Sequence, residues 1–83
     1  MSTQEEVRDF IVHNFYVPEP QTLDDAASLI DAGIVDSTGV LELLAFVESE
    51  FAVHVDDREI VPENFGSIER ISAFVERKHS KAA

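Results

Sequence analysis

The sequence predicts a small all-α protein, a four-helix bundle with three main helices, one short helix and a long ordered loop between helices one and two. Apolar residues recur at helical spacing in three separate segments, and helix-starting and helix-breaking residues flank each of them. The 83 residues, 45% of them hydrophobic, suit one domain with a compact core. We therefore expect residues 1–83 to form a single domain, and we interpret the alternating segment AVHVDD as loop because no second strand exists to pair with it.

Helix one is expected at about residues 3–16. Ser2 and Thr3 each stand three residues before a glutamate, so either one can start the helix with a capping box. Apolar side chains then repeat at helical spacing from Val7 onward. The run must stop before Pro18, because proline disfavours the helical conformation in the residue that precedes it.

Residues 17–36 form a long connection that is too apolar for a solvated linker. Its apolar residues are therefore expected to pack onto the core: Leu23, Leu29, Ile30, Ile34 and Val35. Gly33 suits a sharp turn. At the end of the loop, either Asp36 or Ser37 can cap the next helix with a side-chain oxygen.

Helix two is expected at about residues 37–51. Successive residues of a helix lie about 100° apart, and one arc is an apolar stripe that we expect to be buried. This stripe contains Val40, Leu43, Leu44, Val47 and Phe51. The opposite arc contains Thr38, Leu41, Glu42, Ala45 and Ser49, with Phe46 and Glu48 towards its borders. Apolar and acidic side chains share this outer surface, whereas a purely solvated face would lack Leu41.

The last third of the chain contains two helix signals. Pro62 can open a short helix at about residues 61–65, which Gly66 ends. Ser67 can cap a last helix at about residues 67–79. Basic side chains near its C-terminal end complement the helix dipole, namely Arg77, Lys78 and Lys81.

The composition restricts the possible partners and chemistry. Seventeen acidic residues against six basic ones give a net charge of −11. This charge repels nucleic acid and anionic membranes and attracts basic protein surfaces. Alternatively, the acidity only keeps a small protein soluble. Without cysteine, any thiol must come from a cofactor. The N-terminus has no signal-peptide pattern and no stretch reaches the length of a membrane span, so we expect a cytoplasmic protein.

The sequence offers no catalytic or metal-binding constellation. The three histidines lie far apart, and the acidic runs lack the spacing of a calcium loop. Gly39 follows Ser37 as a hydrolase nucleophile turn requires, but Val35 occupies the earlier glycine position. No phosphate-binding glycine loop occurs either. We therefore expect a protein that is not an enzyme.

Residues 26–51, AASLIDAGIVDSTGVLELLAFVESEF, resemble the modification site of the acyl carrier protein and peptidyl carrier protein family, in which an Asp-Ser-Leu motif opens the second helix. The resemblance rests on the SLIDAGIVDS lead-in, on Glu42 five residues after the serine, on the ESEF ending of helix two and on the acidic balance. It extends over most of the chain, because the family also has a long loop before the motif and a short third helix where VPENFGSI stands.

This resemblance, to the free-standing type of carrier, implies a modification at Ser37. A magnesium-dependent phosphopantetheinyl transferase would attach 4′-phosphopantetheine from coenzyme A to the Ser37 hydroxyl, with Asp36 supporting the transfer. The thiol of this arm would hold an acyl, aminoacyl or peptidyl group as a thioester. A helix start suits the attached phosphate, because its free amides and positive dipole end favour an anion.

The resemblance also implies that helix two is the docking surface for partners. The docking residues would be Thr38, Leu41, Glu42, Ala45 and Glu48. The implied partners of this monomer, besides the transferase, are an adenylating acyl or amino acid ligase and downstream condensing, transferring or tailoring enzymes with basic docking surfaces. Nucleic acid and membranes are not expected partners.

Two departures from the family pattern suggest a specialised biosynthetic pathway. Thr38 stands where leucine is usual, and Gly39 stands where fatty-acid carriers commonly have an acidic residue. Glycine in the first turn would loosen the start of the helix. The alternative is an unmodified acidic helical adaptor that binds a basic protein through helix two, with Ser37 only as a helix cap.

Overall fold

The computed structural model describes residues 2–82, with side chains described as far as Ser80. Four α-helices form the fold: α1 (Thr3–Asn14), α2 (Ser37–Phe51), α3 (Pro62–Phe65) and α4 (Ile68–Ala82). Two short 3₁₀ helices, η1 (Pro20–Thr22) and η2 (Asp57–Glu59), lie in the connections. Residues 2–82 contain no strand, which confirms the predicted all-α class. The segment AVHVDD is loop, as interpreted, as far as Asp56, and its last residue, Asp57, begins η2.

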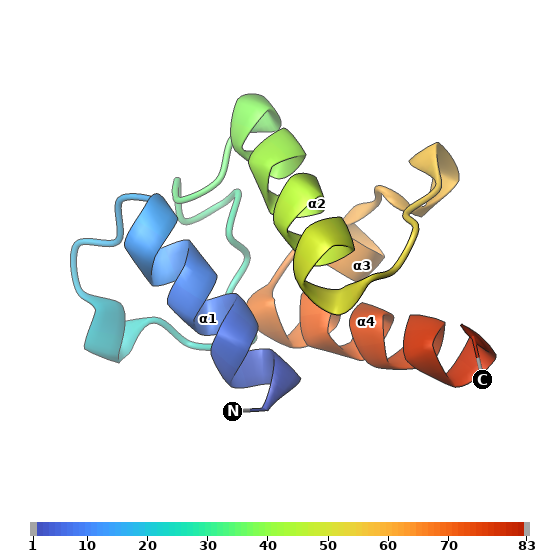
Figure 1. The fold of residues 1–83 in the computed structure, drawn as a ribbon. Helices are drawn as coiled ribbons and strands as arrows, with labels where there is room; N and C mark the ends of the chain where they lie inside the picture. Colours follow the sequence, from blue (N-terminus) through green and yellow to red (C-terminus); the bar gives the residue numbers. More distant parts are fainter. Residues whose placement is uncertain (1, 83) are drawn as a thin grey trace.

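The core lies where the apolar stripes of the helices meet. In Figure 1, α4 runs beneath α1 and α2, and α3 lies behind them. The helices bury Val7, Ile11, Leu43, Val47, Phe51, Phe65, Ile68, Ile71, Phe74 and Val75, and the connections add Leu29, Val35 and Val55. Each fully buried aliphatic or aromatic side chain contributes roughly 1.5–3 kcal/mol. Helix packing around one core therefore supplies most of the stabilisation.

The first helix begins as predicted and ends earlier. Ser2 and Glu5 form a reciprocal capping box, in which the Ser2 Oγ accepts from the Glu5 amide at 3.1 Å and Glu5 Oε1 accepts from the Ser2 amide at 3.2 Å. The helix ends at Asn14 instead of residue 16 because Phe15 adopts an extended conformation, with its N–H closing the last turn. Tyr16 lies outside the helix and is 81% exposed.

The second helix spans the range that its side-chain pattern predicts, and the last helix is longer than predicted. Val40 and Leu44 are only partly buried, at the edge of the core. Ser67 caps α4 as predicted, since its Oγ accepts from the Arg70 amide at 3.1 Å. This helix begins at Ile68 and continues to Ala82, three residues beyond the predicted end.

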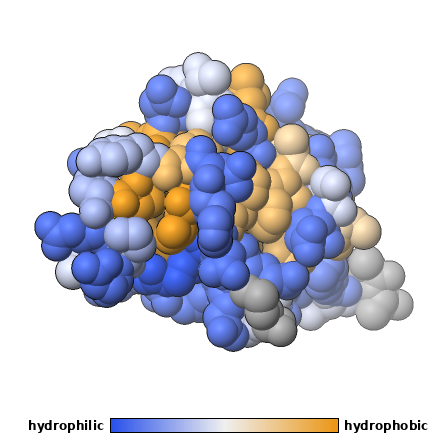
Figure 2. Space-filling view, turned by 60° about the vertical axis from the view of Figure 1, so that its left-hand side comes forward, coloured by the Kyte–Doolittle hydropathy of each residue, from blue (hydrophilic) through white to orange (hydrophobic). Residues whose placement is uncertain are grey.

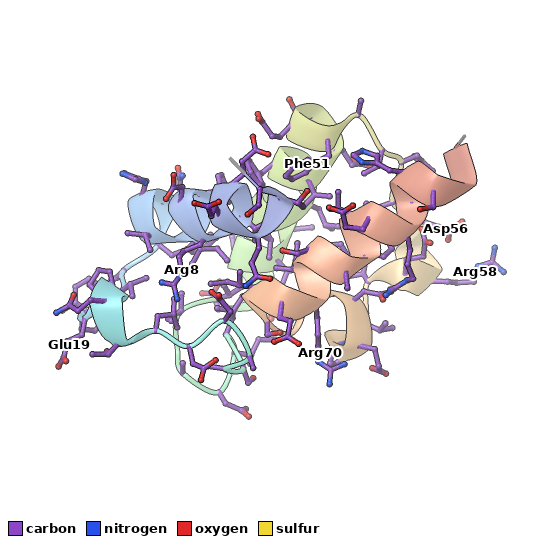
Figure 3. All side chains as sticks on the ribbon, turned by 90° about the horizontal axis from the view of Figure 1, so that it is seen from below. Arg8, Glu19, Phe51, Asp56, Arg58 and Arg70 are labelled. Atoms are coloured by element: carbon purple, nitrogen blue, oxygen red, sulfur yellow. The ribbon has the colours of Figure 1, made fainter. Side chains whose placement is uncertain are left out.

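Arg8 makes three of the contacts that hold the long connection between α1 and α2 against the first helix, and Gln4 Nε2 adds a hydrogen bond to Asp25 Oδ2 at 2.6 Å. Arg8 Nη1 donates to the Pro20 carbonyl at 3.1 Å, and Nη2 donates to the Leu23 carbonyl. Its Nε pairs with Asp25 Oδ1 at 3.1 Å. Figure 3 shows Arg8 reaching from α1 towards this loop. The guanidinium thus replaces the backbone hydrogen bonds that a regular element would provide.

The same connection is also tied to the end of the chain. The Leu29 amide donates to the Gly66 carbonyl at 2.9 Å, and the Glu69 amide donates to the Asp25 carbonyl at 2.9 Å. Leu29 and Val35 are buried, as predicted for this loop, and Leu23 and Ile34 pack against the core. Ile30 is 55% exposed, so the prediction that it packs onto the core is wrong.

Candidate functional site

The candidate site is the start of α2, where Asp36 is the helix cap. Asp36 has an extended backbone, with φ −111° and ψ −172°. Its Oδ1 accepts from the Gly39 amide at 2.7 Å, and its carbonyl accepts from the Val40 amide at 3.0 Å. Of the two residues that could cap this helix, Asp36 therefore fills the role. Ser37 is free of it.

Ser37 is the first residue of the helix, and its side chain faces solvent. Asp36, Ser37 and Thr38 are all exposed. The amides of Ser37 and Thr38 precede the first intrahelical hydrogen bonds, and they lie at the positive end of the helix dipole. In the preceding loop, Gly33 has the positive φ of +75° that suits the predicted turn. An exposed hydroxyl beside free amides fits a phosphodiester attached at Ser37.

Gly39 was expected to loosen the start of α2, but in the structure it allows close packing there. It is buried, and a Cβ at this position would lie 2.8 Å from Phe15 Cε1 and 3.3 Å from Val35 Cγ1. The glycine therefore allows Phe15 to pack directly on the first turn of α2. The residue that ends α1 thus supports the site.

The predicted docking residues differ in their surroundings. Thr38, Leu41, Glu42 and Ala45 are exposed along the outer side of α2, and Leu41 is 66% exposed. Glu48 is half-buried and turns towards the loop that follows the helix. Its Oε2 accepts from the Val55 amide at 2.9 Å and lies 3.6 Å from His54 Nδ1. The structure therefore gathers the first four residues on one surface and engages Glu48 elsewhere.

Ile30 is an exposed residue that the sequence reasoning misplaced. The Leu29 carbonyl accepts from the Ile34 and Val35 amides, which folds the loop into a compact turn immediately before Asp36. This turn buries Leu29 and leaves its neighbour Ile30 outside. Among the residues with described burial, the large exposed apolar side chains are Tyr16, Ile30 and Leu41. On the face that Figure 2 presents, hydrophobic surface is interspersed with hydrophilic side chains.

Two of the histidines contact backbone carbonyls, and the third is largely exposed. His79 Nε2 lies 2.8 Å from the Phe51 carbonyl, and His13 Nδ1 lies 2.7 Å from the Asp9 carbonyl. His54 is 85% exposed. Within residues 2–82 no group of three or more metal-ligating side chains comes together, and no helix has the length and apolar character needed to cross a membrane.

The helical fold and the exposed serine directly after a capping aspartate agree with the carrier class that the sequence resembles. Protein-family models give no match to the chain. Curated proteins do: the probable acyl carrier protein PigG of a Serratia species is 33% identical over 67 residues, which are 81% of this chain and 77% of that protein. The D-alanyl carrier proteins of Streptococcus equi subspecies zooepidemicus and equi are 33% identical over 76 residues, 92% of this chain and 94% of theirs. The chain belongs to the carrier-protein family.

Proposed function

We propose that this carrier bears 4′-phosphopantetheine on Ser37 and presents a tethered acyl, aminoacyl or peptidyl group to partner enzymes. The observation that supports this most is the division of roles between two neighbouring residues: Asp36 caps α2, so the exposed Ser37 hydroxyl is free for modification. When bound, the arm supplies the thiol that forms the thioester, in a chain with no cysteine of its own.

Asp36 can support the transfer while it caps the helix. The hydrogen bond from the Gly39 amide uses Oδ1. The residue is exposed, so Oδ2 is available to the magnesium ion or the basic groups of a phosphopantetheinyl transferase. The two roles proposed for this aspartate therefore use different oxygens of one carboxylate.

The exposed side of α2 is the proposed contact for the transferase and for later partners. Leu41 and Ala45 supply apolar contact, and Glu42 supplies charge, beside Thr38 at the start of the helix. Opposite charge speeds encounter with basic surfaces and sets orientation, whereas the apolar contacts discriminate among partners. Glu48 contributes its negative charge from the end of this surface while it holds the Val55 amide.

An adenylating acyl or amino acid ligase is the proposed source of the cargo, in a specialised biosynthetic pathway. The named relatives are an acyl carrier and D-alanyl carriers, so both cargo classes are represented among similar chains. Thr38 and Gly39, which depart from the pattern of fatty-acid carriers, support a specialised role. Loading assays with an adenylating ligase and a panel of amino and carboxylic acids will identify the class, whereas loading with long fatty acyl groups alone would contradict this source.

Intact mass spectrometry tests the modification. Incubation with coenzyme A and a broad-specificity transferase is expected to add one phosphopantetheine to the wild-type chain and none to Ser37→Ala. Ser49→Ala, which removes another exposed serine of α2, is the matched control and should be modified normally. A wild-type mass that does not change would reject the carrier assignment in favour of an unmodified adaptor. Modification of Ser37→Ala would place the arm elsewhere.

A further inference from the structure

A groove runs between α1 and α2, on the flank of α2 away from Leu41. The two helices are antiparallel along it: Phe15 of the chain leaving α1 lies against Gly39, and further along Phe10 stacks on Phe46. The ring centroids of Phe10 and Phe46 are 4.0 Å apart with an interplanar angle of 14°. Figure 1 shows α1 and α2 as neighbours above α4.

The floor of this α1–α2 groove is aromatic and fixed in place. Phe10 and Phe46 are half-buried, so part of each ring faces solvent. Phe46 also packs edge-on against the core residue Phe51 at 5.7 Å, and Phe10 packs edge-on against Phe15 at 6.0 Å. The rings therefore form a rigid apolar surface at the bottom of the groove.

The rim of the groove is acidic on both sides. Glu6 and Asp9 of α1 and Glu42 and Glu50 of α2 line it, and three of the four are exposed while Glu6 is half-buried. The ion pairs of residues 2–80 use other carboxylates, those of Asp25, Glu48, Asp56 and Glu59. His13 is the single side chain of the lining that can gain positive charge. The rim charges are thus left for a partner.

We propose that the α1–α2 groove binds a basic amphipathic helix of a partner protein. A third helix laid between two antiparallel helices can place its apolar stripe on Phe10 and Phe46. Its lysine and arginine side chains can then extend to the carboxylates on both rims. The charge selects this occupant, because a second copy of a chain with net charge −11 is repelled by the same carboxylates.

The groove and the modification site lie on different sides of α2. At about 100° per residue, Phe46 lies half a turn around the helix axis from Ser37. A helix bound in the groove therefore leaves Ser37 and Leu41 accessible. Glu42 and Ala45 line the groove and also belong to the docking surface proposed above, so a helix in the groove and a partner bound through that surface share these two residues. This inference does not depend on what is attached to Ser37.

A synthetic amphipathic helical peptide of leucine and lysine is the probe. Added to the isotope-labelled Ser37→Ala chain at low salt, it is expected to shift the backbone amide NMR signals of Phe10, Phe46 and Glu50 more than those of Leu41. The same titration on the phosphopantetheine-bearing chain should give the same pattern. Shifts centred on Leu41, or no binding, would overturn the proposal and leave the proposed function of Ser37 untouched.

Charge variants provide the second measurement. The double variant Glu6→Gln, Glu50→Gln is expected to weaken peptide binding about three- to tenfold, since it removes two charges that can pair with the peptide. The double variant Glu63→Gln, Glu69→Gln removes two exposed carboxylates outside the groove and should change the affinity less than about twofold. Equal weakening by both double variants would show unspecific attraction to an acidic surface and would refute the groove.

The aromatic floor is tested by Phe46→Leu. This substitution keeps an apolar side chain of similar volume and removes the stack on Phe10. Peptide affinity is expected to fall about threefold or more, because the stacked aromatic pair that forms the floor is lost. Circular dichroism of the variant verifies that the helices are retained, and unchanged affinity in a folded variant would contradict an aromatic floor.

Discussion

At the start of α2, one hydrogen bond makes Asp36 the helix cap and leaves the Ser37 hydroxyl free of that role. Asp36 accepts from the Gly39 amide at 2.7 Å and so stabilises the first turn, while Ser37 projects into solvent. In many helices a serine would make this bond itself. A change at the Ser37 side chain is therefore expected to leave the cap of the helix intact.

Substitutions at these two positions should therefore differ in stability. Asp36→Ala is expected to lower the free energy of unfolding by about 1 kcal/mol, because the Gly39 amide loses its acceptor. Ser37→Ala should change it by less than about 0.5 kcal/mol. Urea unfolding followed by circular dichroism measures both. Asp36→Asn, which can also cap, is the control that keeps most of the stability, and a larger loss for Ser37→Ala than for Asp36→Ala would contradict the cap assignment.

Gly39 and Phe15 are a second coupled pair of residues. Gly39→Ala would bring a methyl group within 2.8 Å of Phe15 Cε1. The clash costs about 1–3 kcal/mol, of which the better helix propensity of alanine offsets up to about 1 kcal/mol. We expect a net loss of stability of about 1 kcal/mol in the wild-type background.

A double-mutant cycle checks this coupling. In a Phe15→Ala background the ring is absent, so Gly39→Ala should become neutral or stabilising. Thermal unfolding of the four proteins in the cycle measures the coupling free energy. Additive effects of the two substitutions would show that Phe15 is not the reason for a glycine at this position.

At the scale of elements, the sequence predicts those helix boundaries that neighbouring residues determine. Asp36 and the apolar stripe that follows it are local, so the range of α2 was predictable. The end of α1 was not, because Pro18 sets only an upper limit and Phe15 leaves the helix to pack on Gly39. In the loop, no periodicity tells which of Leu29 and Ile30 faces outwards. The hydrogen bonds of Leu29 to Gly66, Ile34 and Val35 determine which of the two side chains is buried.

The candidate site also has one part that the sequence predicts and one part that it does not. The position of Ser37 at a helix start was predictable, because a cap residue and a helical stripe lie beside it in the sequence. The groove was not, since Phe46 lies at the border of the α2 stripe and its stack on Phe10 depends on how two helices pack. Contacts between distant elements leave no signal in a single sequence.

A second ion pair joins η2 to α4. Lys78 Nζ contacts Glu59 Oε1 and Oε2 at 2.9 and 3.2 Å, and the Asp56 amide donates to Glu59 Oε1 at 2.9 Å. The Asp56 amide first, and then Lys78, holds the pKa of Glu59 below its ordinary value of 4.5. Since the folded pKa is the lower one, this contribution to stability is present above pH 4.5 and is lost as the pH falls through the folded pKa.

Glu59→Gln should therefore be less stable than the wild type at neutral pH, and the difference should shrink as the pH falls below 4.5. Urea unfolding of both proteins at several pH values measures the difference. Glu63→Gln removes one exposed carboxylate of α3 and serves as the control. A difference that stays constant or grows towards acid pH would show that the hydrogen bonds of Glu59 do not depend on its charge.

At the scale of the whole molecule, the basic residues serve the fold and the acidic ones dominate the surface. Arg8 holds the loop, Arg77 donates to Asn64 Oδ1 at 2.7 Å and Lys78 pairs with Glu59. The chain of 83 residues nevertheless has a net charge of −11. Repulsion among the carboxylates opposes the compact state.

Added salt should therefore stabilise the protein at neutral pH. Sodium chloride screens the repulsion, and a gain of about 1 kcal/mol corresponds to a rise in melting temperature of roughly 4–8 °C for a domain of this size. Differential scanning calorimetry at increasing sodium chloride concentration measures the rise. Near the isoelectric point of about 4.3 the effect should be small. A melting temperature that falls with salt at neutral pH would mean that the ion pairs outweigh the repulsion.

The ties between the long connection and the end of the chain bear on the order of events during synthesis. The Leu29 amide donates to the Gly66 carbonyl, and the Glu69 amide donates to the Asp25 carbonyl, so the native turn before Ser37 is fixed only after residues 66–69 have been made. A ribosome that has translated α2 but not α4 has produced Ser37 without the partners that position its lead-in. A transferase that recognises this native lead-in, as proposed for Ser37, is therefore expected to act only after residues 66–69 have been made.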